Sequence, residues 1–376
     1  LLENGTIIKK GAIYVTLEGL SKKVFKLHNF KMPAESNSEY SLLIEATTTT
    51  TNKWSQAGHI VAWEEFILQS PAVTLNTLNS TKQVTFKEKG NQLVSIAFDG
   101  GELVFDKSKG EIISLTKGKK KIVDGGFSLS FVRAYIDNDK KPNLRSTWDK
   151  LDLHNLQSTV EEIKFGTINK NVIIDVKKKH QAKNHSNGFT TTERFVISQQ
   201  GVIDVSLNVD YLGKGKPFTF PRIGYEIKLN KNIQNSTWYG KGPGSSYKDR
   251  NTGMKLGTYS ANIDEHFVNY ARPQENGNKS DVRWAKFYDA KQKGFLVKGE
   301  KALNFSFRKY TTAQLNVATH PYELKSNTFN ILNVDFDHGA LGNGSCGPIP
   351  MNKYFTDICN KSYKLRMDFT TEKTSK

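Results

Sequence analysis

Hydrophobic and polar residues alternate with a period of two along much of the chain. The clearest runs place apolar side chains at every second position in residues 203–211, 223–229 and 363–369. Such alternation predicts β-strands that turn one face toward a core. Turn-forming stretches such as Lys89-Gly90-Asn91 and Asp99-Gly100-Gly101 separate the runs, and no long stretch keeps a helical period. The pattern therefore predicts an all-β protein.

One short helix is expected within this strand-rich pattern. Gln314 follows Thr311 by three residues, which is the spacing of a capping box at a helix N-terminus. The spacing predicts a short helix between two strands, beginning just after Thr311.

The distribution of turn residues divides the chain into two domains. Pro71 and a stretch rich in Ser, Thr and Asn predict a linker over residues 70–80. Residues 1–69 are fewer than the about 100 that a seven-stranded sandwich needs, so we expect them to be the last strands of one. The chain is thus expected to begin inside a domain. Residues 81–372 are expected to form one large antiparallel domain.

The formal net charge of +17 raises the question of a nucleic-acid partner. The basic residues are scattered, and only Lys117 to Lys121 and Lys177 to Lys179 form tight runs. Neither run has the aromatic and glycine pattern of an RNA-binding sheet, so a lysine-rich solvated surface is favoured. No apolar run reaches the about 18–20 residues that span a bilayer. Neither a nucleic acid nor a membrane is expected as a partner.

Cys346 and Cys359 are the two cysteines of the chain. Two cysteines allow one bridge but no disulfide framework, and two free thiols are favoured. Cysteine usage therefore leaves the compartment open.

Four groups of motifs carry a resemblance to a known family. In chain order they are Ser55-Gln56-Ala57-Gly58-His59 with Ala62-Trp63; Arg133-Ala134 with Asp137-Asn138-Asp139; Trp238-Tyr239-Gly240-Lys241-Gly242-Pro243 with Tyr247-Lys248-Asp249-Arg250; and Gln274-Glu275-Asn276-Gly277 with Val282-Arg283-Trp284. Together they resemble the C-terminal region of glycoside hydrolase family 2 β-galactosidases. The shared order of the motifs over nearly the whole chain makes the resemblance specific.

The resemblance implies an architecture and a set of partners. It implies a truncated immunoglobulin-like sandwich followed by a large β-supersandwich similar to galactose mutarotase. In this family of retaining enzymes, the two catalytic glutamates and the magnesium ligands lie on an upstream barrel, so no catalytic residue and no cofactor are expected here. The expected partners are that barrel, in the same polypeptide, and a β-galactoside or related carbohydrate. The resemblance leaves room for an oligomeric full-length protein, and a Lys- and Asn-rich chain is typical of a secreted or periplasmic bacterial glycosidase.

The resemblance also places a substrate-binding loop at Gly342-Asn343-Gly344-Ser345-Cys346-Gly347-Pro348, which is expected to face the barrel pocket. In lactose-cleaving members a tryptophan at the position of Cys346 stacks on the sugar. A cysteine has no π-face and cannot stack in this way, so a preference for lactose is not carried over. Asn343, Ser345 and Cys346 are the expected substrate-contacting residues. No histidine lies near Cys346 in sequence to support a nucleophile.

A second loop, after the Asp137-Asn138-Asp139 cluster, aligns with a family segment that moves at the mouth of the active site. Lys140, Lys141, Asn143 and Arg145 are therefore expected to form a lid. The acidic cluster itself has two interpretations, a hard-cation site or a turn that pairs with Arg133, and the second is favoured. Asp249 and Arg250 similarly are expected to brace a glycine-rich loop more than to bind sugar.

Two alternative functions remain open at this point. One is a free-standing carbohydrate-binding module. Core or interdomain packing is the favoured interpretation of Trp148, and an exposed aromatic platform is the alternative, because this tryptophan lies in a polar stretch. The other is a mutarotase-like aldose epimerase, which needs a histidine and a carboxylate facing each other across a pocket. The possible pairs combine His320 or His338 with Glu323 or Asp335. The eight histidines show no metal-binding spacing.

Overall fold

The computed structural model describes residues 1–27, 31, 37–71, 73–140 and 144–370, and the chain separates into two compact units, Leu1–Ala72 and Val73–Lys376. Unit 1 holds one antiparallel sheet with the strand order β2-β1-β3-β4. Its strands are β1 (Leu2–Glu3), β2 (Thr6–Ile7), β3 (Tyr40–Thr47) and β4 (Ile60–Gln69). Among the described residues of this unit, only Leu2 and Tyr40 are fully buried hydrophobic side chains.

Unit 2 is built on one antiparallel sheet of 16 strands. The main path runs β10-β11-β12-β13-β20-β18-β19-β14-β9-β8-β7-β6-β5, and β17, β15 and β16 branch from β18. The strands are β5 (Thr85–Lys89), β6 (Leu93–Phe98), β7 (Gly101–Asp106), β8 (Glu111–Lys117), β9 (Lys120–Ser130), β10 (Gln157–Ile168), β11 (Asn171–Gln181), β12 (Gly188–Ile197), β13 (Val202–Leu212), β14 (Arg222–Asn230), β15 (Asn235–Gly242), β16 (Lys255–Asn262), β17 (Lys279–Tyr288), β18 (Gly294–Arg308), β19 (Phe329–His338) and β20 (Lys361–Asp368).

The sheet of unit 2 curls until its two end strands meet. Phe86 of β5 and Phe165 of β10 have ring centroids 5.2 Å apart. Phe105 of β7 packs edge-on against Phe195 of β12 at 6.1 Å, across the interior of the curl. Because inward-facing side chains alternate along each strand, this curvature encloses one continuous apolar core. The predicted all-β class is confirmed. Two of the three segments whose alternation was clearest lie within β13 and β14, and the third lies in β20 except for its last residue, Phe369.

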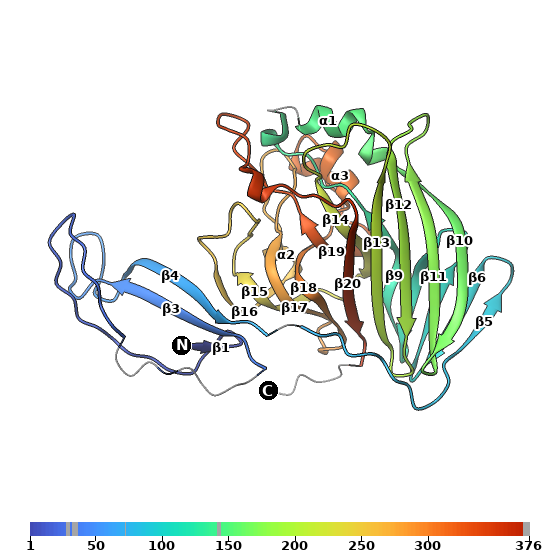
Figure 1. Cartoon of the computed structure of the whole chain (residues 1–376), viewed down its shortest axis with the longest axis horizontal. Helices are drawn as coiled ribbons and strands as arrows, with labels where there is room; N and C mark the ends of the chain where they lie inside the picture. The colour runs from blue at the N-terminus through green and yellow to red at the C-terminus, as the bar shows by residue number, and fades with distance from the viewer. Residues whose placement is uncertain (28–30, 32–36, 72, 141–143, 371–376) are drawn as a thin grey trace. The chain divides into compact units, whose positions relative to one another are not determined.

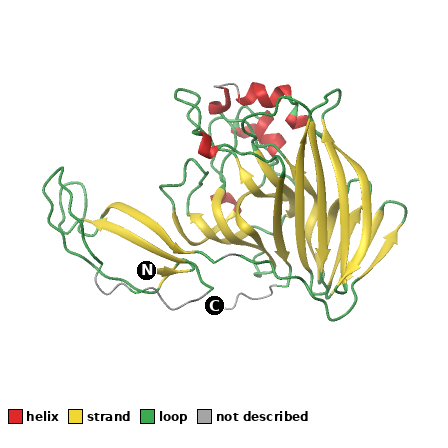
Figure 2. Cartoon of the chain, in the orientation of Figure 1, coloured by secondary structure: helices red, strands yellow, loops and turns green. Residues whose placement is uncertain are grey.

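Helical turns gather mostly at one end of these strands (Figure 2). The helices are α1 (Leu144–Lys150), α2 (Ile263–His266) and α3 (Thr312–Val317), with 3-10 turns η1 (Asp137–Lys140), η2 (Leu153–Asn155), η3 (Pro321–Glu323) and η4 (Asn352–Tyr354). Thr311 caps α3 by accepting from the backbone N–H of Gln314, whose side chain in turn accepts from the backbone N–H of Thr311. The short helix expected after Thr311 is therefore confirmed.

The favoured interpretation of Trp148 as a packing residue is confirmed. Trp148 lies on α1, is 2% exposed, and donates a hydrogen bond from Nε1 to the carbonyl of Thr219 at 2.8 Å. Leu144 and Trp148 are one helical turn apart, so they share the face that covers a second apolar cluster with Phe189 and Phe220. Trp148 is thus a core residue and not an exposed platform for carbohydrate.

Candidate functional site

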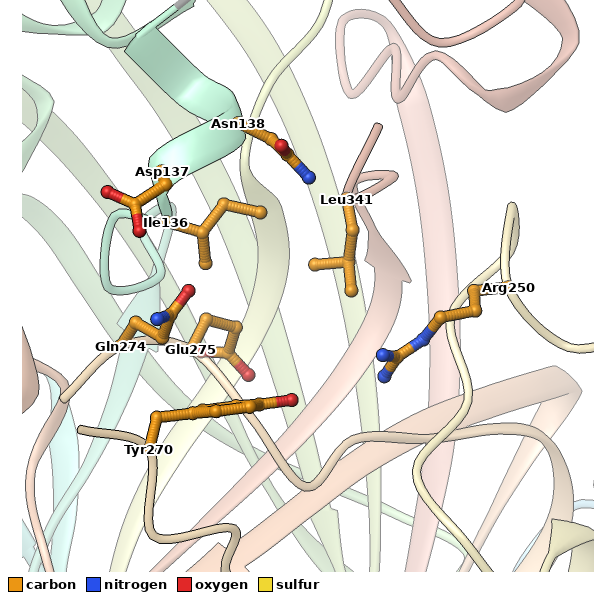
Figure 3. Close-up of a pocket in the computed structure, with 8 residues that line it drawn as sticks. All are labelled: Ile136, Asp137, Asn138, Arg250, Tyr270, Gln274, Glu275 and Leu341. Atoms are coloured by element: carbon orange, nitrogen blue, oxygen red, sulfur yellow. The ribbon is translucent and has the colours of Figure 1, made fainter. Parts of the chain in front are cut away.

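A pocket of about 240 Å³ lies in unit 2 where four segments distant in sequence meet (Figure 3). The segments are η1, the loop between β15 and β16, the loop between α2 and β17, and the residues that follow β19. The lining residues are Ile136, Asp137, Asn138, Arg250, Tyr270, Gln274, Glu275 and Leu341. Asp137, Asn138, Arg250, Gln274 and Glu275 belong to the sequence motifs described above. The fold therefore brings three of the four motif groups to one place.

Asn138 joins η1 to the loop that carries Cys346. Its side-chain amide donates to the carbonyl of Gly342 at 2.5 Å. Its Oδ1 accepts from both the backbone N–H and the hydroxyl of Ser345, at 3.0 and 2.6 Å. Residues 342–348, called the Cys346 loop below, are thus held by one side chain at two points.

Asp249 fixes the same loop from the other side. Its carboxylate accepts the backbone N–H groups of Leu341 and Gly342 at 3.0 and 2.7 Å. Arg250 donates to the hydroxyl of Ser245 at 2.9 Å and lies over the ring of Tyr247. These contacts fit the expected bracing role of Asp249 and Arg250, although the exposed Arg250 also lines the pocket.

A buried ion pair fixes the backbone at η1. Arg133 and Asp139 are both 0% exposed and joined by two hydrogen bonds of 2.8 Å each. Asp139 also accepts the backbone N–H of Ile136 at 2.9 Å, and Arg133 donates to the carbonyl of Ala134 at 3.1 Å. The expected pairing of Arg133 with the acidic cluster is confirmed, and the pair fixes the backbone that presents Asp137 and Asn138.

The three residues of the acidic cluster have separate partners, so they do not converge on an ion. Asp137 pairs with Lys140 at 2.8 Å, Asn138 binds the Cys346 loop, and Asp139 pairs with Arg133. Among the described residues, no group of three or more His, Cys, Asp or Glu side chains could hold a metal ion.

Glu275 is the most buried charge of the pocket lining. Burial alone would raise the pKa of its carboxyl, but Arg308, His338 and Arg222 outweigh burial and hold that pKa well below its usual range. Oε1 lies 4.0 Å from Arg308 and accepts from the hydroxyl of Tyr247 at 3.4 Å, whereas Oε2 has no hydrogen-bond donor among the described residues. Glu275 is therefore an ionised acceptor with unused capacity.

The remaining lining suits a polar ligand with one apolar face. Tyr270 is 36% exposed, and Figure 3 shows its ring along one side of the pocket, with Gln274 and Glu275 beside it. In the same view Arg250 and Asp137 stand on opposite sides. A flat ring with nearby amide, guanidinium and carboxylate groups can contact both the C–H face and the hydroxyls of a sugar.

The histidine–carboxylate pairs considered for an epimerase do not face each other across the pocket, although His338 lies behind its lining, with Nε2 3.8 Å from Oε1 of Glu275. His320 and Glu323 form an exposed pair at 3.2 Å on the surface. Asp335 directs both carboxylate oxygens at Arg222, one at 3.0 Å. His338 is buried, with Nδ1 2.9 Å from the carbonyl oxygen of Gly339. None of these four side chains lines the pocket.

The predicted substrate-contacting residues lie beside the pocket and not in its lining. Asn343, Ser345 and Cys346 are all exposed on the Cys346 loop. Both cysteines are free thiols, as expected, and burial raises the pKa of Cys359 to about 11. Cys346 is thus the accessible thiol of the two.

The predicted lid is described only at its two ends. Lys140 ends η1 and pairs with Asp137, and Arg145 in α1 lies 3.4 Å from Asp149 and over the ring of Tyr135. Lys141 and Asn143 lie outside the described residues. The lid stays a prediction.

Sequence reasoning assigned none of the eight lining residues to a ligand site, and three of them, Ile136, Tyr270 and Leu341, lie outside the recognised motifs. Tyr270 carried a usable signal, because it is an aromatic residue in a polar stretch that follows the capping box of α2. Ile136 and Leu341 each flank a recognised motif, but an isolated apolar residue next to a turn gives no indication of a pocket.

The family of the chain follows from its match to known sequence families. The family model described as "Beta galactosidase small chain" matches residues 98–369. The chain belongs to the β-galactosidase small-chain family. A second model, "Beta-galactosidase, domain 4", matches residues 1–69. The resemblance drawn from the motifs is confirmed.

Curated relatives of this small-chain family member are named β-galactosidases. That of Priestia megaterium is 25% identical over 96% of this chain and 34% of the relative. That of Kluyveromyces lactis is 27% identical over 80% of this chain and 29% of the relative. The chain thus spans about a third of the length of these relatives.

The similarity of this chain to solved structures is weaker than its similarity to the curated sequences. Galactose 1-epimerase from Lactobacillus acidophilus has a TM-score of 0.44 at 8% identity and covers 77% of this chain and 98% of its own. A galactose mutarotase-like protein from Clostridium acetobutylicum has a TM-score of 0.39 at 11% identity, with coverages of 76% and 97%. These scores are too low to transfer an activity to the small-chain family member.

Proposed function

We propose that this chain is the non-catalytic C-terminal region of a β-galactosidase-like retaining glycoside hydrolase. It completes the wall of an active site whose catalytic barrel lies upstream in the same polypeptide. The observation that carries the proposal is the Cys346 loop, which Asn138 and Asp249 fix at its base while Cys346 stays exposed. A loop held in this way can position side chains against a second surface at little entropic cost.

The residues that follow the loop support contact with a partner surface. Ile349 is 42% exposed and Met351 is 58% exposed. Adjacent exposed apolar side chains are typical of surfaces that another protein covers. The barrel is the partner that we propose for this surface.

Unit 1 also exposes apolar side chains on a sheet with almost no core of its own. Ile44, Val61 and Phe66 are 47%, 53% and 48% exposed. A sheet needs a second layer to bury such residues. We propose that preceding strands of the same polypeptide supply this layer and complete an immunoglobulin-like sandwich.

The proposed substrate is a β-galactoside or related carbohydrate. Cys346 offers no stacking face, so the sugar is held by hydrogen bonds and by the barrel, and lactose is not the assigned substrate. The catalytic glutamates and the magnesium site belong to the barrel in this proposal. No cofactor is assigned to this chain.

Selective labelling of Cys346 tests the proposal. A maleimide reacts with the exposed Cys346 in preference to Cys359, since burial raises the pKa of Cys359 to about 11. The labelling rate is measured for the chain alone, with the purified upstream region, and with that region plus a non-hydrolysable aryl thio-β-galactoside. We expect the upstream region to slow labelling and the thiogalactoside to slow it further.

Two controls make the labelling result specific. Cys359→Ser should label like the unchanged chain, and Cys346→Ser should lose the reaction. If the upstream region binds the chain but leaves the labelling rate of Cys346 unchanged, the loop does not face the active site and the proposal fails.

A free-standing carbohydrate-binding module is the second candidate function. The observation that favours it is the partly exposed ring of Tyr270 beside Gln274 and Glu275 in a formed pocket. It predicts that the chain alone binds a galactoside in calorimetric titration and that Tyr270→Ala removes the signal. A flat titration across a panel of mono- and disaccharides excludes the module.

A further inference from the structure

A second groove, of about 700 Å³, lies at the far end of β14 from the pocket. Arg222, the first residue of β14, pairs in register with His338, and Leu341 of the pocket follows His338 closely. Asn230, the last residue of β14, lines the groove. A nine-residue strand is about 27 Å long, so the two sites are separate.

The groove has a strongly basic lining. Its residues are Gly100, Lys117, Gly118, Lys119, Lys120, Lys121, Ile122, Asn230, Asn232, Ile233, Asp289, Lys293, Gly294 and Phe369. The lysine run of residues 117–121 is the turn between β8 and β9, and Lys293 precedes β18. Five lysines therefore face one carboxylate, that of Asp289.

The carboxylate of Asp289 is already bound within the protein. It pairs with Lys120, and its Oδ1 accepts the backbone N–H groups of Lys291 and Lys293 at 2.8 and 3.0 Å. These bonds hold the turn between β17 and β18 against the turn between β8 and β9. Asp289 thus braces the groove and leaves most of the lysine charge uncompensated.

Three of the five lysines have no carboxylate partner among the described residues, and of these Lys117 is already bound within the protein, with its Nζ 5.3 Å from the centroid of the Phe98 ring. Lys117 donates to the backbone carbonyls of Asp99 and Gln200, at 2.7 and 3.3 Å, and these carry no net charge. Lys119 and Lys293 are exposed, and neither pairs with a carboxylate among the described residues. Their ammonium groups are positioned at the rim of a concave surface and not scattered over a convex one.

The apolar residues of the lining expose little surface. Ile122, Ile233 and Phe369 are 5%, 4% and 2% exposed and belong to the hydrophobic core beneath the groove. Asn232 adds an exposed side-chain amide at the edge. A ligand that fits must combine hydroxyl or carbonyl groups with several anionic substituents.

We propose that this groove binds an oligosaccharide that carries sulfate or carboxylate groups. The anionic groups meet Lys119 and Lys293, Lys117 adds its charge from nearby, and a hydroxyl meets Asn232. Single-stranded nucleic acid fits less well, because the lining includes no arginine and no exposed aromatic ring for base stacking. The site goes beyond the proposed role at the Cys346 loop and does not depend on it.

Isothermal titration of the 376-residue chain tests this binding, with a heparin-derived tetrasaccharide as the probe. The double variant Lys119→Gln/Lys293→Gln removes two charges that form no internal ion pair. The matched control, Lys183→Gln/Lys214→Gln, removes two exposed charges that follow β11 and β13. We expect the groove variant to weaken binding about tenfold and the control to change it less than about twofold.

Four further titrations complete the test, with the desulfated tetrasaccharide, with the sulfated one in added salt, with an oligothymidylate and with anionic lipid vesicles. The desulfated tetrasaccharide should bind at least about tenfold more weakly, and added salt should weaken binding of the sulfated one. Equal weakening by the two lysine variants would overturn the proposal, because it would indicate diffuse surface charge. Tighter, groove-dependent binding of an oligothymidylate or of anionic lipid vesicles would also overturn it, as would no binding of the sulfated probe.

Discussion

Asn138 and Ser345 are 207 residues apart in sequence and are joined by two hydrogen bonds of 3.0 and 2.6 Å. The contact ties the turn after β9 to the Cys346 loop after β19. We expect Asn138→Ala to release the loop, because its three hydrogen bonds to the loop are lost, at a cost of about 1–2 kcal/mol in the free energy of unfolding. Activity on an aryl β-galactoside, regained by mixing with the upstream region, should fall about tenfold or more.

Asn91→Ala, in an exposed turn, is the matched control for Asn138→Ala and should leave both quantities unchanged. Urea unfolding and initial rates measure the two effects. Full activity in Asn138→Ala would show that the position of the Cys346 loop has no part in the active site.

The buried pair of Arg133 and Asp139 predicts a non-additive effect on stability. Arg133→Met leaves a buried carboxylate without its partner, so we expect a loss of about 3–5 kcal/mol in urea unfolding. The double variant Arg133→Met/Asp139→Leu should lose less than Arg133→Met alone, since no unpaired charge remains. Lys89→Met, which breaks an exposed pair with Glu102, should cost under about 1 kcal/mol. Additive losses in the double variant would contradict this account.

Two buried histidines predict how stability depends on pH. Burial lowers the pKa of His180 and of His266 to about 3, whereas an unfolded histidine titrates near 6.5. Between these values the unfolded chain binds protons that the folded chain does not, so stability is full above about pH 6.5 and falls toward pH 3. Each histidine should contribute a slope of about 1.4 kcal/mol per pH unit.

Urea unfolding of variants between pH 4 and 7 measures this slope. His180→Gln and His266→Gln should each reduce it, and His59→Gln, which removes an exposed imidazole, should not. An undiminished slope in both buried variants would refute the assignment of acid sensitivity to these residues.

Trp148 predicts a stability effect without a binding effect. Trp148→Ala should cost about 3–5 kcal/mol, because it empties part of the cluster formed with Phe189 and Phe220. Trp54→Ala, at a site 69% exposed, should change stability by less than about 0.5 kcal/mol. Trp148→Phe should leave saccharide titrations unchanged. Loss of saccharide binding in a stable Trp148→Phe variant would show instead that Trp148 contributes to a ligand site.

Substitution at Cys346 tests its position relative to the sugar. In the mixture with the upstream region, Cys346→Trp should lower KM for an aryl β-galactoside a few-fold, because an indole ring adds a stacking face. Cys346→Ser should leave KM unchanged. Equal KM values for Cys346→Trp and the unchanged chain would place residue 346 away from the sugar.

The sequence predicted those features that local patterns determine. Alternation marked β13, β14 and β20, the capping box marked α3, and the motif order indicated the family before any coordinates. The motifs singled out in the sequence contain five of the pocket residues, but the sequence predicted structural roles for them and not a pocket. The predicted features depend on neighbours a few residues away.

Features that depend on distant contacts were missed or left open. The sequence favoured packing for Trp148 but left an exposed platform open, and the packing of α1 on Phe189 and Phe220 decides for the core. Lys119 and Lys293 are far apart in sequence, so the basic groove appears only when two hairpin turns meet at Asp289. A lysine run that reads as ordinary solvated surface thereby becomes part of a concave site.

Turnover of an aryl β-galactoside is the most direct measurement of the central claim. Initial rates are compared for this chain alone, the upstream region alone, and an equimolar mixture of the two. The account predicts no turnover by the chain alone and turnover by the mixture that exceeds the sum of the separate rates. Turnover by the chain alone, undiminished after repeated purification, would place the catalytic residues in this chain and contradict the account.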